Sequence, residues 1–330
     1  MKLSILDQIP ISKGSNATEA LASSVEIAKL GDQLGYERMW LAEHHNTKTL
    51  ASSAPEITAA YIAAKTERIR VGTGGIMMMH YSPFKIAEVF KTLAGLAPGR
   101  IDFGAGRAPG GDGAAMTALA SGRRPEMTEQ YDKLEIILRM MNEKPTGEQI
   151  YDAVVATPAQ ITLPQAWLLG SSGQSARQAG AAGVGYSFAQ FFNGQMSKEI
   201  FDAYRNSFQP SYFMHKPEII TTYAVSVAET REEAEYLALP MQITRLNLMR
   251  GQLIQVLSPE DAKDYPLTEM DKILIENNRH LLLVGTAKEV ANQIREEQEL
   301  YGFDEAMLNC NQFSTEQRLT SYRLLAEEML

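Results

Sequence analysis

Four short polar segments of this 330-residue sequence combine residue types that can bind a ligand or transfer a proton. They are Glu43–Asn46, Met77–Tyr81, Arg107 with the glycines before it, and Gly170–Ser175. Each segment directly follows a short run that is typical of a β-strand. If these strands are parallel neighbours, their carboxyl ends bring all four segments to one face of the protein.

The segment Gly170–Ser175 has the composition of an anion-binding helix start. It leads into a predicted helix, and the N-terminus of a helix offers unpaired N–H groups and a partial positive charge. A simpler interpretation is that Ser172 or Ser175 only caps the helix, which is a common function of serine. Arg107 favours the first interpretation, because we expect it at the same face and its planar guanidinium suits phosphate oxygens.

The adjacent His44 and His45 could bind a metal or transfer a proton. Neighbouring side chains in an extended segment point in opposite directions, so at most one imidazole faces a central cavity. Glu43 and His80 could complete a metal site, but the spacings typical of zinc ligands are missing, so we expect no metal. His44 is better explained as an acid/base or hydrogen-bonding group, with a purely structural loop histidine as the alternative.

Three consecutive methionines, Met77–Met79, follow Gly74 and Gly75. Soft thioethers adapt to flat aromatic surfaces, and glycines let the backbone come close to a ligand. Ordinary core packing is the alternative, because the chain has 16 methionines. Together the four segments suggest a flat aromatic cofactor that bears a phosphate, and flavin mononucleotide (FMN) more than a sugar phosphate.

The elements that must position these segments alternate between strand and helix. We predict eight strands, at Leu3–Asp7, Arg38–Ala42, Ile69–Ile76, Ile101–Gly106, Trp167–Leu169, Val184–Ala189, Glu218–Ala228 and Glu305–Asn309. We predict helices at Thr18–Gly35, Ser53–Thr66, Pro83–Ala97, Pro125–Asn142, Gln174–Ala181, Ser197–Phe208, from Thr230, from Val284 to Tyr301, and at Ser314–Met329.

Eight strand–helix units without a hydrophilic linker indicate one α/β domain over residues 1–330, a (β/α)₈ TIM barrel with a probable insertion at 251–280. A doubly wound sheet with a second domain is the alternative. Its G-x-G-x-x-G fingerprint would follow the first strand, where the sequence has only Gly14. Gly104-Ala105-Gly106 has half of that pattern and is a weak signal.

The composition excludes several classes of protein. A formal charge of −9 argues against a broad surface for nucleic acid or anionic lipid, and 45% hydrophobic residues argue against disorder. The single cysteine, Cys310, excludes an intramolecular disulfide and a cysteine-based metal cluster. No apolar run approaches the roughly 18–20 residues of a membrane span, and no signal segment is evident, so we expect a cytoplasmic protein.

Several segments resemble the bacterial luciferase-like flavin monooxygenase family, in order over nearly the whole chain. They are WLAEHHN, IRVGTGGIMMMHYSPFKIAEVFKTLAGLAPGRIDFGAGRAPG, LLGSSGQSARQAGAAGVGY, VGTAKEVANQI and DEAMLN. The single-chain luciferase-like oxidoreductases of unassigned substrate are the most similar subgroup. The resemblance implies a (β/α)₈ fold and a reaction with reduced FMN, supplied by a separate NAD(P)H-dependent flavin reductase. The flavin reacts with O₂ to a C4a-hydroperoxyflavin that oxygenates a small organic substrate.

Position by position, the resemblance assigns phosphate binding to Arg107, Ser172 and Ser175, with backbone contributed by Gly170 and Ser171. This location after the fourth and fifth predicted strands rests on the resemblance, because barrels of this type more often bind phosphate after the last two strands.

The resemblance also assigns residues to the flavin ring. His44 matches the histidine that supports the flavin–oxygen chemistry. Thr73, Gly74 and Gly75 fall where the family often has a non-proline cis peptide lining the ring, and Met77 approaches the same ring. Gly106 stands where a light-emitting subunit has a cysteine, a departure that puts bioluminescence in doubt.

Two alternatives to a monooxygenase remain open. One is a reductase or dehydrogenase of the same superfamily that uses a flavin or the deazaflavin F420, and the other is a non-catalytic flavin-binding protein. The resemblance further implies a homodimer through the second and third helices and a substrate lid in the insertion at 251–280. The apolar residues available for that contact, which could equally be core, are Ile57, Ala60, Ile62, Phe84, Val89 and Phe90.

Overall fold

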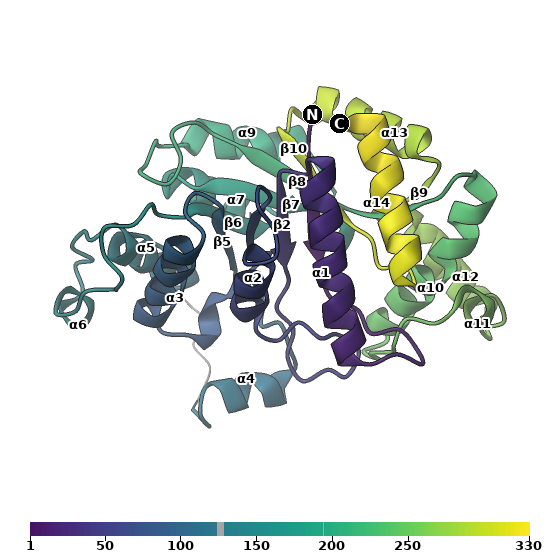
Figure 1. Ribbon diagram of the computed structural model, residues 1–330, viewed down its shortest axis with the longest axis horizontal. Helices are drawn as coiled ribbons and strands as arrows, with labels where there is room; N and C mark the ends of the chain where they lie inside the picture. The colour runs from purple at the N-terminus through teal and green to yellow at the C-terminus, as the bar shows by residue number, and fades with distance from the viewer. Residues whose placement is uncertain (124–128, 194) are drawn as a thin grey trace.

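The computed structural model describes residues 1–123, 129–193 and 195–330. Within these residues eight parallel strands close into a barrel, which confirms the predicted (β/α)₈ fold (Figure 1). The barrel strands are β1 (Lys2–Asp7), β2 (Arg38–Leu41), β3 (Arg70–Thr73), β5 (Ile101–Gly106), β6 (Gln165–Gly170), β7 (Gly185–Ala189), β8 (Ile219–Val227) and β10 (Glu305–Asn309).

Helices surround this barrel (Figure 1). The longer ones are α1 (Ala17–Leu34), α2 (Pro55–Ala63), α3 (Pro83–Leu96), α5 (Gln130–Met141), α7 (Gly173–Ala181), α9 (Lys198–Ser207), α10 (Arg231–Met249), α12 (Glu269–Asn277), α13 (Ala287–Tyr301) and α14 (Thr315–Met329). The shorter ones are α4 (Gly113–Leu119), η1 (Met78–His80), α6 (Gln149–Asp152), α8 (Gln190–Asn193), α11 (Pro259–Lys263) and η2 (Arg279–Leu281).

Local sequence signals explain where these elements begin and end. The helix α1 starts after Asn16, whose side chain accepts a hydrogen bond from the N–H of Glu19 at 3.1 Å. It ends at Gly35, whose φ of 91° is the left-handed conformation that favours glycine. The strand β8 is buried along its whole length, including Thr221, Thr222 and Ser226, as expected for a parallel strand covered on both faces.

The strand register brings the polar segments of the sequence to one end of the barrel. Leu41 of β2 pairs with Thr73 of β3, and Ala105 of β5 pairs with Leu168 of β6. The loops that follow these strands therefore leave from the same edge. In Figure 1 this edge lies at the lower side, with α4 beyond it, and both chain termini lie at the opposite end.

At that opposite end, a buried ion network fills the barrel. The guanidinium of Arg38 lies 2.7 Å from Asp102 and 2.8 Å from Glu305, and Arg70 lies 2.6 Å from Asp102. Burial alone would raise the pKa of Asp102, but the charges of Arg38 and Arg70 lower it below its ordinary value. Two cations and two carboxylates thus balance each other, which closes this end and leaves the other end as the mouth.

The structure differs from the sequence prediction in several elements. The predicted strand 69–76 is two strands, because β3 ends at Thr73 and the short β4 (Ile76–Met77) pairs further along β5. A strand that we did not predict, β9 (Leu282–Gly285), pairs with the end of β8 outside the barrel. The insertion at 251–280 contains the helices α11 and α12, and α4 was also missed. The start of the predicted helix 125–142 lies outside the described residues, which show α5 from Gln130.

Only part of the apolar surface expected for a homodimer is exposed. Ile62 of α2 and Phe90 of α3 are fully buried in the core, so they cannot contact a second copy. Ile57 of α2 is 67% exposed and is available for such a contact. The homodimer remains a prediction. Of these three residues, only Ile57 could contact a second copy.

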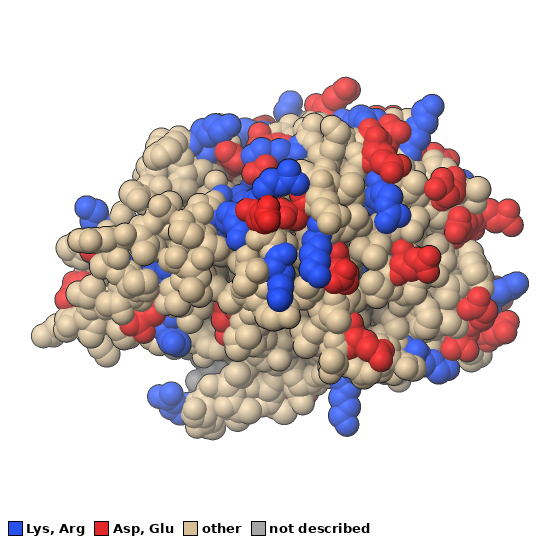
Figure 2. Space-filling model, viewed as in Figure 1, with Lys and Arg blue, Asp and Glu red and all other residues tan. Residues whose placement is uncertain are grey.

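Figure 2 shows acidic and basic side chains interspersed over the middle and right of the face in view, while the left part of this face carries few charges. Among the described helices, none is long and apolar enough to cross a membrane.

We expect Arg38→Met to lower the free energy of unfolding by about 3–5 kcal/mol, because it leaves two buried carboxylates without their shared cation. Urea unfolding followed by tryptophan fluorescence measures this, since Arg38 lies against the rings of both Trp40 and Trp167. The matched control is Arg139→Met, which breaks an exposed pair with Glu135 and should cost less than about 1 kcal/mol. A loss for Arg38→Met no larger than for the control would contradict the proposed balance of charges.

Candidate active site

The start of α7 is the most polar part of the mouth. Ser172 and Ser175 form a reciprocal capping box, in which the Ser172 side chain accepts from the Ser175 N–H and the Ser175 hydroxyl accepts from the Ser172 N–H. A side chain at Gly170 would collide with Ser175, so glycine is required there. Ser171, between Gly170 and Ser172, is partly exposed. The structure therefore confirms that Ser172 caps this helix, whereas anion binding at the helix start remains a proposal.

A tyrosine that the sequence analysis missed completes this helix start. The hydroxyl of Tyr186 in β7 lies 3.1 Å from the Ser175 hydroxyl and donates to the carbonyl of Ser172 at 3.2 Å. Burial raises the pKa of Tyr186 to about 12, although its hydrogen bonds to Ser175 and Ser172 and the charge of Arg107 oppose this rise. Tyr186 is therefore a neutral hydrogen-bonding group at neutral pH.

Arg107 follows β5 and has no anionic partner among the described residues. Its guanidinium carbon lies 4.5 Å from the ring centre of Tyr131, on α5, in a cation–π contact. Its buried Nε and the buried hydroxyl of Tyr131 lack hydrogen-bond partners in the part of the chain that the structure describes. A buried guanidinium nitrogen and a buried hydroxyl without partners are costly, and an anion could accept a hydrogen bond from each.

The glycine-rich turn after β3 lies against β5. The peptide bond between Gly74 and Gly75 is cis, as the resemblance implied. A Cβ atom on Gly75 would come within 2.8 Å of the backbone nitrogen of Gly106, so only glycine allows this approach. Thr73 donates a hydrogen bond from its hydroxyl to the Gly104 carbonyl at 2.8 Å. The glycines thus let β3 and β4 pack closely against the backbone of β5.

Of the three methionines, Met77 contacts a predicted site residue, Gly106. A Cβ atom on Gly106 would meet the Met77 side chain at 3.0 Å, so the two residues are in close contact beside Arg107. Met78 is fully buried and belongs to the main hydrophobic core, which confirms the core alternative for that residue.

The two histidines of the loop after β2 have separate surroundings. The backbone N–H of His44 donates to the Ser52 carbonyl at 2.7 Å, and its ring Nδ1 is buried without a partner among the described residues. Burial and the nearby charge of His45 lower the pKa of His44 to about 4. At neutral pH His44 is therefore a neutral imidazole that can form a hydrogen bond with a ligand.

His45 instead contacts a carboxylate. Its Nε2 lies 2.7 Å from Glu43, which also accepts hydrogen bonds from the Tyr81 hydroxyl and the Met77 N–H. His80, considered as a metal ligand, contacts the Pro109 carbonyl at 2.6 Å. Within residues 1–123, 129–193 and 195–330, no group of three or more His, Cys, Asp or Glu side chains could hold a metal ion.

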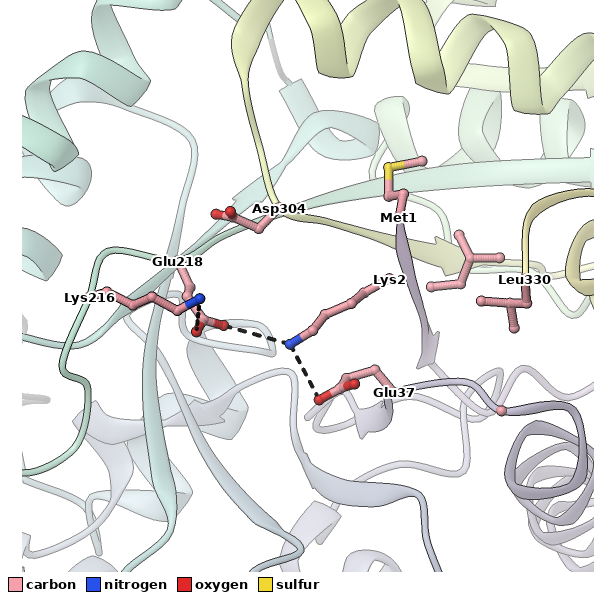
Figure 3. A pocket seen from close by; sticks show the side chains of 9 residues that line it. Met1, Lys2, Glu37, Lys216, Glu218, Asp304 and Leu330 are labelled. Atoms are coloured by element: carbon pink, nitrogen blue, oxygen red, sulfur yellow. Dashed lines mark ion pairs between the residues drawn. The ribbon is translucent and has the colours of Figure 1, made fainter.

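Two pockets lie at opposite ends of the barrel. One of about 480 Å³ lies between the loop after β2 and α4, and is lined by His45, Asn46, Ala114, Ala115, Ala118 and Leu119. The other, of about 450 Å³, lies at the end that holds the termini (Figure 3). Its charges are paired with each other, since Lys2 contacts Glu37 and Glu218, and Lys216 contacts Glu218. The first pocket is therefore the one next to the predicted chemistry.

These residues fit a flavin that bears a phosphate. Arg107, Tyr131 and the start of α7 offer donors for an anion, and Gly74, Gly75 and Met77 carry no charge. Sequence spacing gave no signal for Tyr131 or Tyr186, because neither belongs to a motif. From the sequence, Glu43 was considered only as a possible metal ligand.

Comparisons with known proteins show the family and the fold of this chain. The profile of the family described as luciferase-like monooxygenase matches residues 1–304. The chain is 43% identical over 328 residues to the uncharacterized protein YceB of Bacillus subtilis (strain 168), covering 99% of both chains. It is 34% identical to N-acetyl-S-alkylcysteine monooxygenase of the same organism, covering 100% of this chain and 98% of that protein. The solved structure of apo-MsnO8 matches with a TM-score of 0.90 at 34% identity, covering 99% and 97%.

Two more distant structures share the fold alone. The oxygenating constituent of 3,6-diketocamphane monooxygenase from Pseudomonas putida, in complex with FMN, has a TM-score of 0.71 at 18% identity, covering 99% and 97% of the chains. An F420-dependent secondary alcohol dehydrogenase has a TM-score of 0.65 at 15% identity, covering 98% and 97%.

The lowered pKa of His44 predicts a pH effect on stability. Between its ordinary value of 6.5 and about 4, the unfolded chain binds the proton and the folded chain does not, so stability falls as the pH falls through this window. Between pH 7.5 and pH 5, we expect the free energy of unfolding of the wild type to fall by about 2 kcal/mol more than that of His44→Gln. Urea unfolding at both pH values measures this difference, with His215→Gln at an exposed loop histidine as the control. An unchanged pH dependence in His44→Gln would contradict the assignment.

Proposed function

The chain belongs to the luciferase-like monooxygenase family and is an oxidoreductase, and from this premise we propose that it uses reduced FMN and O₂ to oxygenate a small organic substrate. Reduced FMN, when bound, supplies the two electrons with which one oxygen atom of O₂ enters the substrate while the other leaves as water. A separate NAD(P)H-dependent flavin reductase would supply the reduced flavin, and we place both proteins in the cytoplasm.

The observation that supports this proposal most strongly is the buried Nε of Arg107, which has no hydrogen-bond partner among the described residues. It lies against Tyr131 beside the start of α7, where the charge of a phosphate would meet the helix dipole, the Ser172 and Ser175 hydroxyls and the guanidinium together. The backbone of Gly170 and Ser171 would contribute further contacts to the phosphate. In this arrangement the phosphate end of FMN fixes the position of the ring.

The remaining residues would form the ring site. The Thr73–Gly75 backbone and the Met77 side chain, next to Gly106, offer a wall without charged groups. Such a wall excludes water from the reacting atoms, which matters because early protonation would release hydrogen peroxide instead of oxygenating the substrate. His44 would hold or accept a proton at Nδ1, since this nitrogen is buried and lacks a partner among the described residues.

The pocket beside α4 would take the substrate. Its lining of alanines and Leu119 suits an apolar group, while His45 and Asn46 offer polar contacts at one side. The name of one relative gives N-acetyl-S-alkylcysteine as a substrate, so thioethers of this kind are the first compounds to test. Oxygenation at a thioether sulfur requires no other co-substrate than O₂ and the reduced flavin.

We expect Arg107→Met to raise the dissociation constant of oxidised FMN about 10- to 100-fold, because it removes charge-assisted hydrogen bonds to the phosphate. Quenching of FMN fluorescence during titration measures the constant. Riboflavin, which lacks the phosphate, should bind equally to the wild type and Arg107→Met. Arg139→Met on the exposed side of α5 serves as the control for loss of a positive charge. Equal loss of FMN and riboflavin binding in Arg107→Met would argue against a phosphate contact.

We expect the protein to slow the reoxidation of reduced FMN by O₂ and to couple it to product when a suitable thioether is present. The measurement is an anaerobic titration with reduced FMN, followed by rapid mixing with O₂ and absorbance and product analysis. Reoxidation at the rate of free flavin, without product from any compound tested, would oppose a monooxygenase. A parallel titration with F420 distinguishes the reductase alternative, which predicts tight F420 binding and hydride transfer without O₂ consumption.

A further inference from the structure

One buried carboxylate joins three segments of the mouth. Glu43, directly after β2, is fully buried and accepts three hydrogen bonds. Its Oε2 accepts from the backbone N–H of Met77 at 2.7 Å, and its Oε1 accepts from the Tyr81 hydroxyl at 2.8 Å and contacts His45 Nε2 at 2.7 Å. Nothing in the proposed reaction uses this group so far.

Two of the contacts of Glu43 are donors that an ionised carboxylate can accept. The Met77 N–H and the Tyr81 hydroxyl are donors, and an ionised carboxylate can accept from both and from His45 with its two oxygens. The alternative is a protonated carboxyl that donates to Nε2 of His45, with the imidazole proton on Nδ1. In the part of the chain that the structure describes, His45 is the one side chain that forms an ion pair with Glu43 if protonated. With Glu43 ionised, the contact requires a proton on Nε2 of His45.

The same cluster continues into the loop after β5. The backbone N–H of His45 donates to the Gly110 carbonyl at 2.7 Å, and His80 Nε2 donates to the Pro109 carbonyl at 2.6 Å. The rings of His45 and His80 also meet edge to face, with centres 5.4 Å apart. The loops after β2, β4 and β5 are therefore held together, with Glu43 at their common point.

The Met77 contact connects Glu43 to the proposed flavin site. The hydrogen bond fixes the main chain of Met77 at the place where its side chain contacts Gly106. The same residue pairs with Gly106 across β4 and β5. A shift of the Met77 backbone would therefore change the wall that is proposed to face the flavin ring.

We propose that Glu43 is a positioning residue of the flavin site, which fixes the Met77 main chain and orients the His45 imidazole so that Nδ1 is its nitrogen for contact with a ligand. The inference deepens the proposed function and rests on it. Because the proton of His45 lies on Nε2 toward Glu43, Nδ1 of the neutral ring is an acceptor at the pocket beside α4. A substrate with a hydroxyl or N–H group near its oxidised atom matches this acceptor.

The test uses Glu43→Gln, which keeps the size of the side chain and one acceptor oxygen for Met77. Its amide presents N–H groups where the carboxylate accepted, so we expect His45 to change to the Nδ1–H tautomer. Nitrogen-15 NMR of the imidazoles detects this change, which a merely structural role of Glu43 would not cause. We also expect the dissociation constant of oxidised FMN to rise about tenfold through the displaced Met77.

Three variants separate the parts of the proposal. Tyr81→Phe removes one hydrogen bond and keeps the carboxylate, so the His45 tautomer and the FMN affinity should stay as in the wild type. Glu43→Asp keeps the charge but is too short for all three contacts, so FMN affinity should fall while His45 keeps its proton on Nε2. If Glu43→Gln does not fold, Glu43→Asp still tests whether Glu43 affects FMN affinity. Glu305→Gln, at the closed end of the barrel, should change the free energy of unfolding without changing the His45 tautomer or the FMN affinity.

The outcomes are distinguishable from those of the proposed function. If the wild type binds no FMN, the proposed function fails, whatever the variants show. If the wild type binds FMN and a folded Glu43→Gln retains both the affinity and the Nε2–H tautomer, the positioning role of Glu43 is overturned.

Discussion

Closure of a parallel sheet onto itself is the constraint on which this structure depends. Once β10 pairs with both β1 and β8, every barrel strand has two neighbours and all eight run in one direction. All loops that follow the strands must then leave at one end, where residues from distant parts of the chain meet. His44, Arg107 and Ser172 lie far apart in the sequence and share this end for that reason alone.

The two ends of the barrel differ in whether their charged side chains have partners of opposite charge. At the closed end, Arg38 and Arg70 are matched by Asp102 and Glu305, and each of these four charged groups has a partner of opposite charge. At the mouth, Arg107 lacks an anionic partner among the described residues. A protein can keep such buried groups unsatisfied only if their stability cost is met elsewhere or by a ligand. The contrast is the physical reason to look for binding at the mouth.

The sequence predicts the barrel well because its signals are local and repeated. Strand runs such as Ile101–Gly106 are bounded by turns, and their alternation with helices has few solutions. The cis bond at Gly74–Gly75 followed from resemblance, since no local rule requires it. The short α4 and the strand β9 were missed because their formation depends on tertiary contacts, with the pocket-lining loop and with the end of β8.

The candidate site was predictable only for residues within motifs. Ser172 and Arg107 stand out through glycine-rich surroundings, whereas Tyr131 and Tyr186 occupy ordinary helix and strand positions. Their significance arises from the cation–π contact and the hydrogen bonds that the fold creates. Glu43 shows the same limit, because its partners Met77 and Tyr81 follow another strand.

The pairing of β8 has a consequence for how the protein can evolve. The residues 251–280 leave from the end of α10 and return through β9, which pairs with the last residues of β8 beyond the barrel. Both ends of this segment are thus anchored outside the eight-strand register. Changes in its length or composition would leave the hydrogen bonding of the barrel and the start of α7 intact. Selection can therefore act on this segment separately from the scaffold, so that new variants of it arise without loss of the fold.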